Sequence, residues 1–402
     1  MTQSRFLDRT TPPHILTLVL TAGVAALSLN IFLPSLFSMA KYFGVDYAVM
    51  QLSVSLYLAM TALLQLFIGP VSDRFGRRPV MLVAMAVFVL ATVGAMFAPS
   101  FGWFLAFRLI QACVAIGFAL SRAVVRDMVG QDQAASMIGY VTMGMSLVPM
   151  IGPVIGGALD KIFGWQASFV IMGLCGAGVG ALIWADQGET AKTRSTSFVE
   201  QAMAYPALLK SRRFWGYCLA AGFASGSFFA YLGGASYVAT QIYGMDPAKL
   251  GLYFGAPAVG YLLGNGISGR FAIRLGVNMM ILAGAVVTTL GLAVLAVFDL
   301  AGLATAEVFF GFTVFVGLGN GIMLPSANAG MLSVRPQLAG SAAGLGGAII
   351  IGFGAALSGL AGWVLTAGSG PMPLIMLMFL SSAASLPCIW WVIVRARQIG
   401  AA

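Results

Sequence analysis

Long apolar runs, separated by short polar connections, recur from one end of the chain to the other. A run of about 20 apolar residues crosses the hydrocarbon core of a bilayer as a helix, whereas a membrane β-barrel shows short alternating segments. The pattern therefore predicts an all-α polytopic membrane protein. Its twelve expected transmembrane helices, with bounds loose by several residues, are 14–36, 49–71, 79–98, 101–126, 134–158, 165–185, 213–238, 248–269, 277–298, 302–324, 338–362 and 371–394.

The composition agrees with this pattern. Hydrophobic residues make up 60% of the 402 residues and charged residues only 8%, and the mean hydropathy is +0.95. Such values exclude a water-soluble globular protein.

The net charge of +9 follows the expected topology. Basic residues mark the cytoplasmic connections of membrane proteins. With both termini in the cytoplasm, only Lys41, Lys161 and Lys249 lie outside, and Arg108 lies within the membrane. We therefore expect a lipid bilayer rather than nucleic acid as the partner of these charges, and the bacterial inner membrane as the location.

The four cysteines, Cys113, Cys175, Cys218 and Cys388, lie in four different spans without paired spacing. This distribution is typical of helix packing and indicates neither a disulfide nor a metal site. No cofactor is expected.

The longest polar stretch lies between the sixth and seventh spans and divides the chain into two parts. We expect an N-terminal six-helix bundle at 1–185, a cytoplasmic linker at 186–212 and a C-terminal six-helix bundle at 213–402. Within the linker, residues 198–209 can form an amphipathic helix on the membrane surface.

Charge concentrates in one short connection, "GPVSDRFGRRPV", residues 69–80. A fainter copy, "GNGISGRFAIRLGV", follows the eighth span, and we align Arg74-Phe75 with Arg270-Phe271, which places Gly269 opposite Asp73. Repeats of this kind are typical of secondary transporters, whose substrate site lies at midplane between two pseudo-symmetric halves.

Two interpretations of this connection differ in what they explain. A cluster that only fixes topology accounts for Arg74, Arg77 and Arg78 but not for Asp73, because acids contribute little to orientation. We favour a latch, in which Asp73 pairs with arginines and with a neighbouring helix end. Asp127, at the cytoplasmic end of the fourth span, is the candidate third member.

The pattern Gly69–Asp73–Arg74–Gly76–Arg77–Arg78 resembles the loop signature of the major facilitator superfamily. "FRLIQACVAIGFA" is similar to the fourth-span motif of its drug:proton antiporter branch, and "GMSLVPMIGPVIGGAL" to the fifth-span motif. "SLNIFLPSL", "VRDM" and "AGFASGSFFAYLGGASYV" resemble the bicyclomycin/chloramphenicol-resistance group. The resemblance implies the superfamily fold and a cytoplasmic gate formed by Asp73, Arg77 and Asp127.

In the fifth span, Gly152, Pro153, Gly156 and Gly157 match the motif. Small residues permit close helix packing, and the proline permits a bend. Close packing alone and a rocking hinge both account for this pattern.

An arginine within the membrane is costly and indicates a functional position. Arg108, Gln111 and Arg122 follow helical spacing, so we expect one cationic stripe of the fourth span to line a central cavity. Arg108 is expected to organise that cavity and proton coupling. The expected cavity residues are Asn30, Pro34, Tyr57, Arg108, Gln111, Arg122, Phe228, Tyr231 and Tyr261. Taken one by one, the aromatic members are better explained by ordinary helix packing.

Proton coupling needs a titratable group whose environment changes between states. Relatives in the resembled group carry an acid in the first span, where this chain has Asn30. The coupling candidates are therefore Asp127, Glu307 and Asp73, and we favour Asp127 or Glu307 with Arg108 and Arg122 as charge partners. We expect Glu307 to be well embedded near the outer end of the tenth span.

Other classes of function are poorly supported. No nucleotide-binding Walker motif and no nucleophile–base pair occur, which argues against an ATP-driven pump and against an enzyme. Two similar halves with a gate favour alternating access over a channel. We predict a monomeric exporter of small neutral or anionic amphipathic compounds driven by proton influx. The alternative is a specific metabolite exporter or uniporter without proton coupling.

Overall fold

The computed structural model describes residues 5–128, 131–191, 205–335, 338–365 and 369–398. Helices make up nearly all of this part of the chain. The helices in order are α1 (Ile15–Asn30), η1 (Leu33–Ser35), α2 (Leu36–Phe43), α3 (Tyr47–Phe75), α4 (Arg77–Met96), α5 (Phe101–Gln111), η2 (Ala112–Ala115), α6 (Ile116–Met128), α7 (Gln131–Phe163), α8 (Gln166–Asp186), α10 (Arg212–Tyr237), η3 (Val238–Ile242), α11 (Pro247–Phe254), α12 (Ala256–Leu275), α13 (Val277–Leu300), α14 (Ala306–Ser333), α15 (Ala339–Val364) and α16 (Met372–Gln398).

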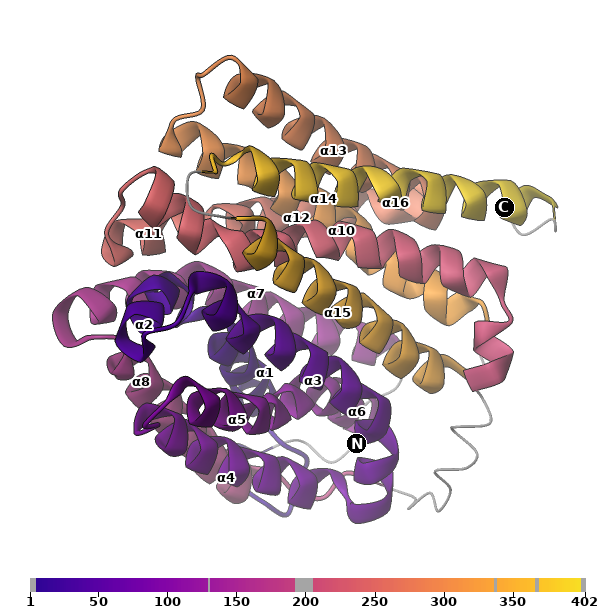
Figure 1. Ribbon diagram of the computed structural model, residues 1–402. Helices are drawn as coiled ribbons and strands as arrows, with labels where there is room; N and C mark the ends of the chain where they lie inside the picture. Colours follow the sequence, from indigo (N-terminus) through magenta and orange to yellow (C-terminus); the bar gives the residue numbers. More distant parts are fainter. Residues whose placement is uncertain (1–4, 129–130, 192–204, 336–337, 366–368, 399–402) are drawn as a thin grey trace.

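The helices form two groups that follow the order of the chain. Figure 1 shows α1–α8 together in indigo and purple, beside α10–α16 in pink, orange and yellow. The end of α16 lies on the right of that view, and we call this end of the molecule the terminal end. The other end, where α2 meets α3 and where α11 begins, is called the opposite end.

Ten helices in the described part of the chain are long and apolar enough to span a membrane. The two remaining expected spans correspond to α7 and to the pair α11–α12, in which a short helix ends at Phe254 before the longer one begins. The all-helical membrane fold is confirmed, and the count of twelve spans stays a prediction.

The fourth span is not one continuous α-helix. A 3₁₀ turn, η2, separates α5 from α6. Because a 3₁₀ turn has 3.0 rather than 3.6 residues per turn, it changes the face on which later residues lie. The straight cationic stripe expected from helical spacing is therefore interrupted between Gln111 and Arg122.

The internal repeat has a different register from the one expected. α3 ends and α4 begins at Gly76, with φ +95°, whereas α12 ends and α13 begins at Gly276, with φ +79°. Both glycines occupy a left-handed conformation that other residues rarely adopt. Gly76 therefore corresponds to Gly276 and Arg74 to Arg274, so our alignment of Arg74 with Arg270 was wrong. Ile273, not Gly269, replaces Asp73 in the second copy.

At the opposite end the two halves touch through their backbones. A Cβ on Gly157 of α7 would overlap the carbonyl oxygen of Pro247 at the start of α11. A Cβ on Gly251 of α11 would likewise overlap the carbonyl oxygen of Pro153. Glycine at both contact points permits an approach that any side chain would prevent.

Polar contacts add to this closure. The Tyr47 hydroxyl donates to the carbonyl oxygen of Gly233 at 2.9 Å, and the Ser236 hydroxyl donates to that of Leu33 at 2.5 Å. An ion pair joins Lys161 Nζ to Asp246 Oδ2 at 2.8 Å. The hydrogen bond from Lys161 holds the pKa of the Asp246 carboxyl below its ordinary range, so we expect this pair to persist into mildly acidic solution.

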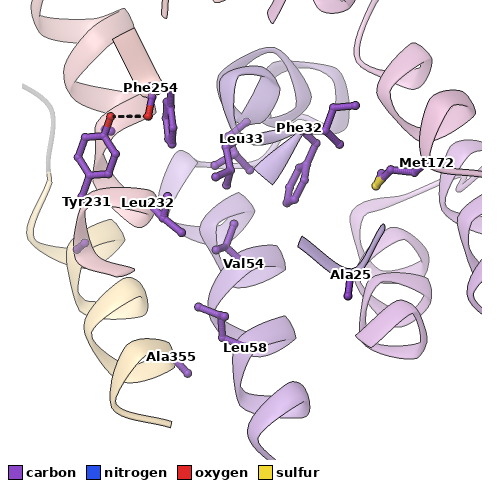
Figure 2. Packing of buried hydrophobic residues seen from close by; sticks show 14 of the residues in the cluster. Ala25, Phe32, Leu33, Val54, Leu58, Met172, Tyr231, Leu232, Phe254 and Ala355 are labelled. Atoms are coloured by element: carbon purple, nitrogen blue, oxygen red, sulfur yellow. Dashed lines mark hydrogen bonds between the residues drawn. The ribbon is translucent and has the colours of Figure 1, made fainter. Parts of the chain in front are cut away.

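Apolar side chains from both halves pack into one cluster near this end. Figure 2 shows Leu33 and Val54 of the N-terminal half beside Leu232 of α10, with the Tyr231 hydroxyl donating to the Phe254 carbonyl oxygen. Leu33, Val54 and Leu232 are at most 1% exposed. The opposite end is therefore closed by a continuous apolar core.

Residues 192–204 of the expected linker, and with them most of the expected amphipathic helix at 198–209, lie outside the described residues, which resume at Tyr205. Residues 205–209 are helical, and Leu208 is fully buried among side chains of the C-terminal half. The Tyr205 hydroxyl reaches across to the carbonyl oxygen of Leu66 on α3 at 3.2 Å. The end of this segment thus touches both halves.

The contact of α7 with the end of α1 generates a prediction. A Cβ on Gly156 would overlap the carbonyl oxygen of Ile31, so Gly156→Ala should destabilise the fold by about 1–3 kcal/mol, as overpacking does. Gly178→Ala is the matched control, because no atom lies within 4 Å of a Cβ there. Melting temperatures in detergent will compare the two variants, and equal values would contradict the close packing of α7.

Candidate functional site

The side chain of Arg77, the first residue of α4, is surrounded by acceptors from the ends of two other helices, α3 and α6. Its Nη2 lies 2.6 Å from Asp73 Oδ1, and its Nε donates to Asp127 Oδ2 at 3.1 Å. Its Nη1 donates to the Ser72 hydroxyl. The Arg77 side chain is only 12% exposed, so these charge-assisted bonds are weakly screened. We call Ser72, Asp73, Arg77 and Asp127 the Arg77 network.

The structure thus brings Asp73, Arg77 and Asp127 together, as the sequence predicted. The two other arginines of the motif behave differently. Arg74 is exposed and lies over the ring of Phe75, whereas Arg78 donates from Nη2 to the carbonyl oxygen of Trp184 at 2.9 Å. Arg78 therefore attaches the start of α4 to the last turn of α8.

The Arg77 network does not connect the two halves. Its members come from the ends of α3, α4 and α6, all in the N-terminal half. Near it, α3 contacts the C-terminal half through Gln65, which faces Gly344 and Gly347 of α15. The expected latch therefore joins three helix ends within one half, and α3 itself contacts α15 of the other half at Gln65.

Ser72 and Glu189 contact Arg77 but were missed from the sequence. Glu189 Oε1 accepts the backbone N–H of Arg77 at 2.9 Å. Ser72 is adjacent to the motif acid, and its spacing from Arg77 was the available signal. Glu189 lies more than 100 positions away, and its polar surroundings in the sequence gave no signal of this contact.

The buried Arg108 lies in a cage of aromatic and polar side chains. Its guanidinium carbon is 4.3 Å from the ring centre of Phe32 and 4.1 Å from that of Tyr57. It donates to the Ser28 carbonyl oxygen at 2.9 Å and to Gln111 Oε1 at 2.8 Å. We call Ser28, Phe32, Tyr57, Arg108 and Gln111 the Arg108 cage.

The cage contains no carboxylate. Three ion pairs occur in the described part of the chain, and none includes Arg108. Its Nε has no hydrogen-bond partner among the described residues. Asn30, in the position of the acid of the resembled group, is 4% exposed and donates its amide to the carbonyl oxygen of Ala26. The charge of Arg108 is balanced by ring faces and dipoles.

The expected cavity residues differ in exposure. Arg108 and Gln111 are fully buried, Tyr57 is 2% exposed and Pro34 lies buried in η1. In this conformation these residues are enclosed in the core of the N-terminal half, because η1 and α2 continue the first span toward the opposite end of the molecule. The expectation that they line an open cavity is not met in this conformation.

The remaining cavity candidates lie on other helices. Tyr231 is fully buried within ring contacts of Phe228, Phe254 and Phe310, which is core packing in the C-terminal half. Arg122 is exposed on α6, within electrostatic range of the half-buried Tyr261 on α12. Arg122 belongs to the N-terminal half and Tyr261 to the C-terminal half.

Glu307 is not embedded as expected. It lies in the first turn of α14, directly after the N-cap Thr305, and it is exposed. The Tyr253 hydroxyl donates to Glu307 Oε1 at 3.2 Å. Because α14 begins at Ala306 rather than several residues earlier, this carboxylate remains at the helix end, at a cavity of about 370 Å³ that Val154 and Phe310 also line.

A larger cavity of about 690 Å³ lies at the opposite end, where Ser38, Lys41 and Asp160 meet Pro247 of the other half. The Ser38 hydroxyl donates to Asp160 Oδ2 at 2.8 Å. The sequence did not indicate this cavity, because its lining comes from four separate elements.

The glycines expected to form a hinge are contact points in this state. Gly152, Gly156 and Gly157 are buried, and Gly152 faces Leu27 and Asn30 of α1. α7 continues through Pro149 and Pro153 as one helix. Close packing accounts for the motif here, and the hinge stays a proposal.

A comparison with protein families matches residues 18–359 to the model described as Major Facilitator Superfamily. The chain belongs to this superfamily. It is similar to a bicyclomycin resistance protein homolog of Haemophilus influenzae, with 29% identity over 89% of this chain and 91% of the relative. Multidrug resistance protein D of Escherichia coli is 28% identical over 90% and 91% of the two chains. A chloramphenicol resistance protein of Pseudomonas aeruginosa is 28% identical over 79% and 76%.

Solved structures confirm the superfamily fold. The human organic anion transporter MFSD10 (TETRAN) superimposes with a TM-score of 0.71 at 18% identity, covering 94% of this chain and 98% of that chain. A bacterial homolog of the human lysosomal transporter Spinster, inward-facing and unoccupied, gives 0.68 at 16% identity over 95% of each chain. At these identities the likeness concerns the fold alone.

The Arg108 cage can be tested by separating the ring of Tyr57 from its hydroxyl. Tyr57→Phe removes the 3.1 Å hydrogen bond with the Ser28 hydroxyl and should cost about 1 kcal/mol. Tyr57→Leu also removes the ring face and should cost about 2 kcal/mol more, because the cation is desolvated. Unfolding in detergent would measure both, and equal losses would show that the ring does not stabilise Arg108.

Proposed function

We propose that this superfamily transporter exports small neutral or anionic amphipathic compounds by alternating access, in exchange for protons. The observation that carries the proposal is the pair of dissimilar ends. The opposite end is closed between the halves by backbone contacts, whereas the charged network at the terminal end lies within one half. The printed names of the relatives, resistance proteins for bicyclomycin, chloramphenicol and multiple drugs, support a drug as cargo.

The orientation follows the distribution of charge. With the basic terminal end in the cytoplasm of a bacterial inner membrane, the closed opposite end faces outward and the described conformation is closed to the outside. The Arg77 network would then act in the cytoplasmic gate, by holding the ends of α3, α4 and α6 on its N-terminal side. We propose a monomer as the functional unit, with 1–185 and 213–402 as the two moving bodies.

The substrate charge follows from Arg108. A guanidinium without a carboxylate partner in the described part of the chain leaves a positive charge inside the N-terminal half. A cation entering the same half would meet repulsion in a low dielectric, whereas an anion or a polar neutral compound would not. In the state open to the outside, Phe32 and Tyr57 would form the aromatic wall of this site.

Proton coupling is assigned to Asp127 in preference to Glu307. Asp127 is half-buried and shares Arg77 with Asp73, so a rearrangement of that network would change the surroundings of its carboxylate. Glu307 is exposed at the opposite end, away from this network. The second candidate function, transport without proton coupling, is favoured by Asn30 in the position of the usual first-span acid.

Replacement of Asp73 tests the gate. Asp73→Asn should abolish drug efflux while membrane insertion remains normal, because Arg77 loses its nearest charged partner, at 2.6 Å. Asp299→Asn is the control and should retain transport. Asp299 lies in the last turn of α13, far from Arg77 at the other end of the molecule. Drug efflux is measured for the two variants in a pump-deficient host. Near-normal efflux by Asp73→Asn would contradict the proposed gate.

The energy source requires a separate measurement in proteoliposomes with an imposed pH gradient. We expect drug efflux to follow the gradient and Asp127→Asn to lose this dependence. Transport that is independent of the gradient in the unsubstituted protein would favour the uncoupled exporter.

A further inference from the structure

Glu189 lies three residues after the end of α8 and accepts hydrogen bonds from two segments of backbone. Its Oε1 accepts the N–H of Arg77 at 2.9 Å, and its Oε2 accepts that of Arg78 at 3.3 Å. The same Oε1 accepts the N–H groups of Thr190 and Ala191, both at 3.0 Å. One carboxylate therefore joins the start of α4 to the segment that follows α8.

The start of α4 has no cap of its own. Gly76 is the N-cap residue and has no side chain, so the first N–H groups of the helix need an acceptor from elsewhere. Glu189 supplies both the acceptor and a negative charge at the positive end of the helix. The bond from Arg78 Nη2 to the Trp184 carbonyl oxygen holds the same two segments together on their other side.

Gly76 also leaves the space that the carboxylate occupies. A Cβ at this position would overlap Glu189 Oε2 and lie 3.0 Å from Glu189 Cδ. Gly276 also has a positive φ at the equivalent turn, but no atom lies within 4 Å of a Cβ there. The two turns thus differ in this contact, which only the N-terminal half makes.

The segment that carries Glu189 is itself fixed by the N-terminal residues. The fully buried Asp186 accepts the N–H groups of Leu7 at 2.7 Å and His14 at 2.8 Å, and the Thr17 hydroxyl at 2.5 Å. The N–H of Gly188 donates to the Thr11 carbonyl oxygen at 3.1 Å. These bonds hold residues 186–188 in place directly before Glu189.

We propose that Glu189 is a positioning residue of the gate. By fixing the first turn of α4, its carboxylate sets the guanidinium of Arg77 between Asp73 and Asp127, and the N-terminal residues set Glu189 through Asp186 and Gly188. Loss of the carboxylate leaves Arg77 chemically intact and displaces it from one or both partners. The inference rests on the proposed function of the Arg77 network.

The first experiment separates the rate of transport from substrate affinity. Glu189→Ala should lower the maximal efflux rate per molecule roughly tenfold, the factor expected for one lost capping interaction, with KM unchanged. Glu189→Gln keeps an acceptor oxygen and should recover part of the rate. Asp46→Asn is the matched control, because Asp46 is an N-cap whose side chain makes no capping hydrogen bond, and it should transport normally.

A double substitution tests whether Glu189 acts through Arg77. If it does, adding Glu189→Ala to Arg77→Lys should lower the rate little beyond Arg77→Lys alone, because both changes disturb one network. The proposal would be overturned if the transport rate of the double variant fell by the product of the two single-variant losses. So would a Glu189→Ala protein that is less thermostable but transports at the normal rate per molecule.

The two turn glycines provide a second test that leaves Glu189 unchanged. Gly76→Ala and Gly276→Ala both place a side chain at a positive φ, but only Gly76→Ala displaces the carboxylate. Gly76→Ala should therefore reduce the transport rate several-fold more than Gly276→Ala, and equal losses would overturn the proposal. If Asp73→Asn is inactive while Glu189→Ala is normal, only this inference fails. If Asp73→Asn itself is normal, the proposed gate fails.

Discussion

A single arginine shared by two carboxylates at the boundary of an apolar protein is the interaction on which the terminal end of the N-terminal half depends. Arg77 is 12% exposed, and Asp73 and Asp127 are 34% and 24% exposed. A charge in such a position is stable only with close partners, because its lost hydration must be replaced. The ends of α3, α4 and α6 are therefore joined to one another by electrostatic contacts, in addition to the apolar packing of Met81 and Val125 nearby.

The opposite end is held by a different kind of force. There the halves approach through glycine and proline backbones, a shared apolar core and a few hydrogen bonds, with one exposed ion pair that contributes little. Packed contacts of this kind can separate and re-form without leaving charges unpaired. A transporter that opens at alternate ends needs such a surface between its halves, together with rigid bodies on either side. The Arg77 network provides part of that rigidity.

Sequence patterns predicted the features that depend on local chemistry. The apolar runs predicted the helical membrane fold, and the concentration of charge at 69–80 predicted the grouping of Asp73, Arg77 and Asp127. Contacts that depend on distant backbone geometry were missed, as with Glu189 and Asp186, because their partners lie far away in the sequence. Two predictions were wrong because they depended on exactly where helices begin and end. Glu307 was placed too deep because α14 begins at Ala306, and the repeat was misaligned because arginine spacing was used instead of the turn glycines.

The central claim, that the two halves separate at the opposite end, is tested most directly by a distance across it. Spin labels at Tyr42 on α2 and Lys249 on α11 occupy exposed positions on the two halves. In lipid bilayers, their distance distribution should contain a short population that matches the closed state and a longer one whose share changes with substrate or pH. A single short distance under every condition would contradict the account.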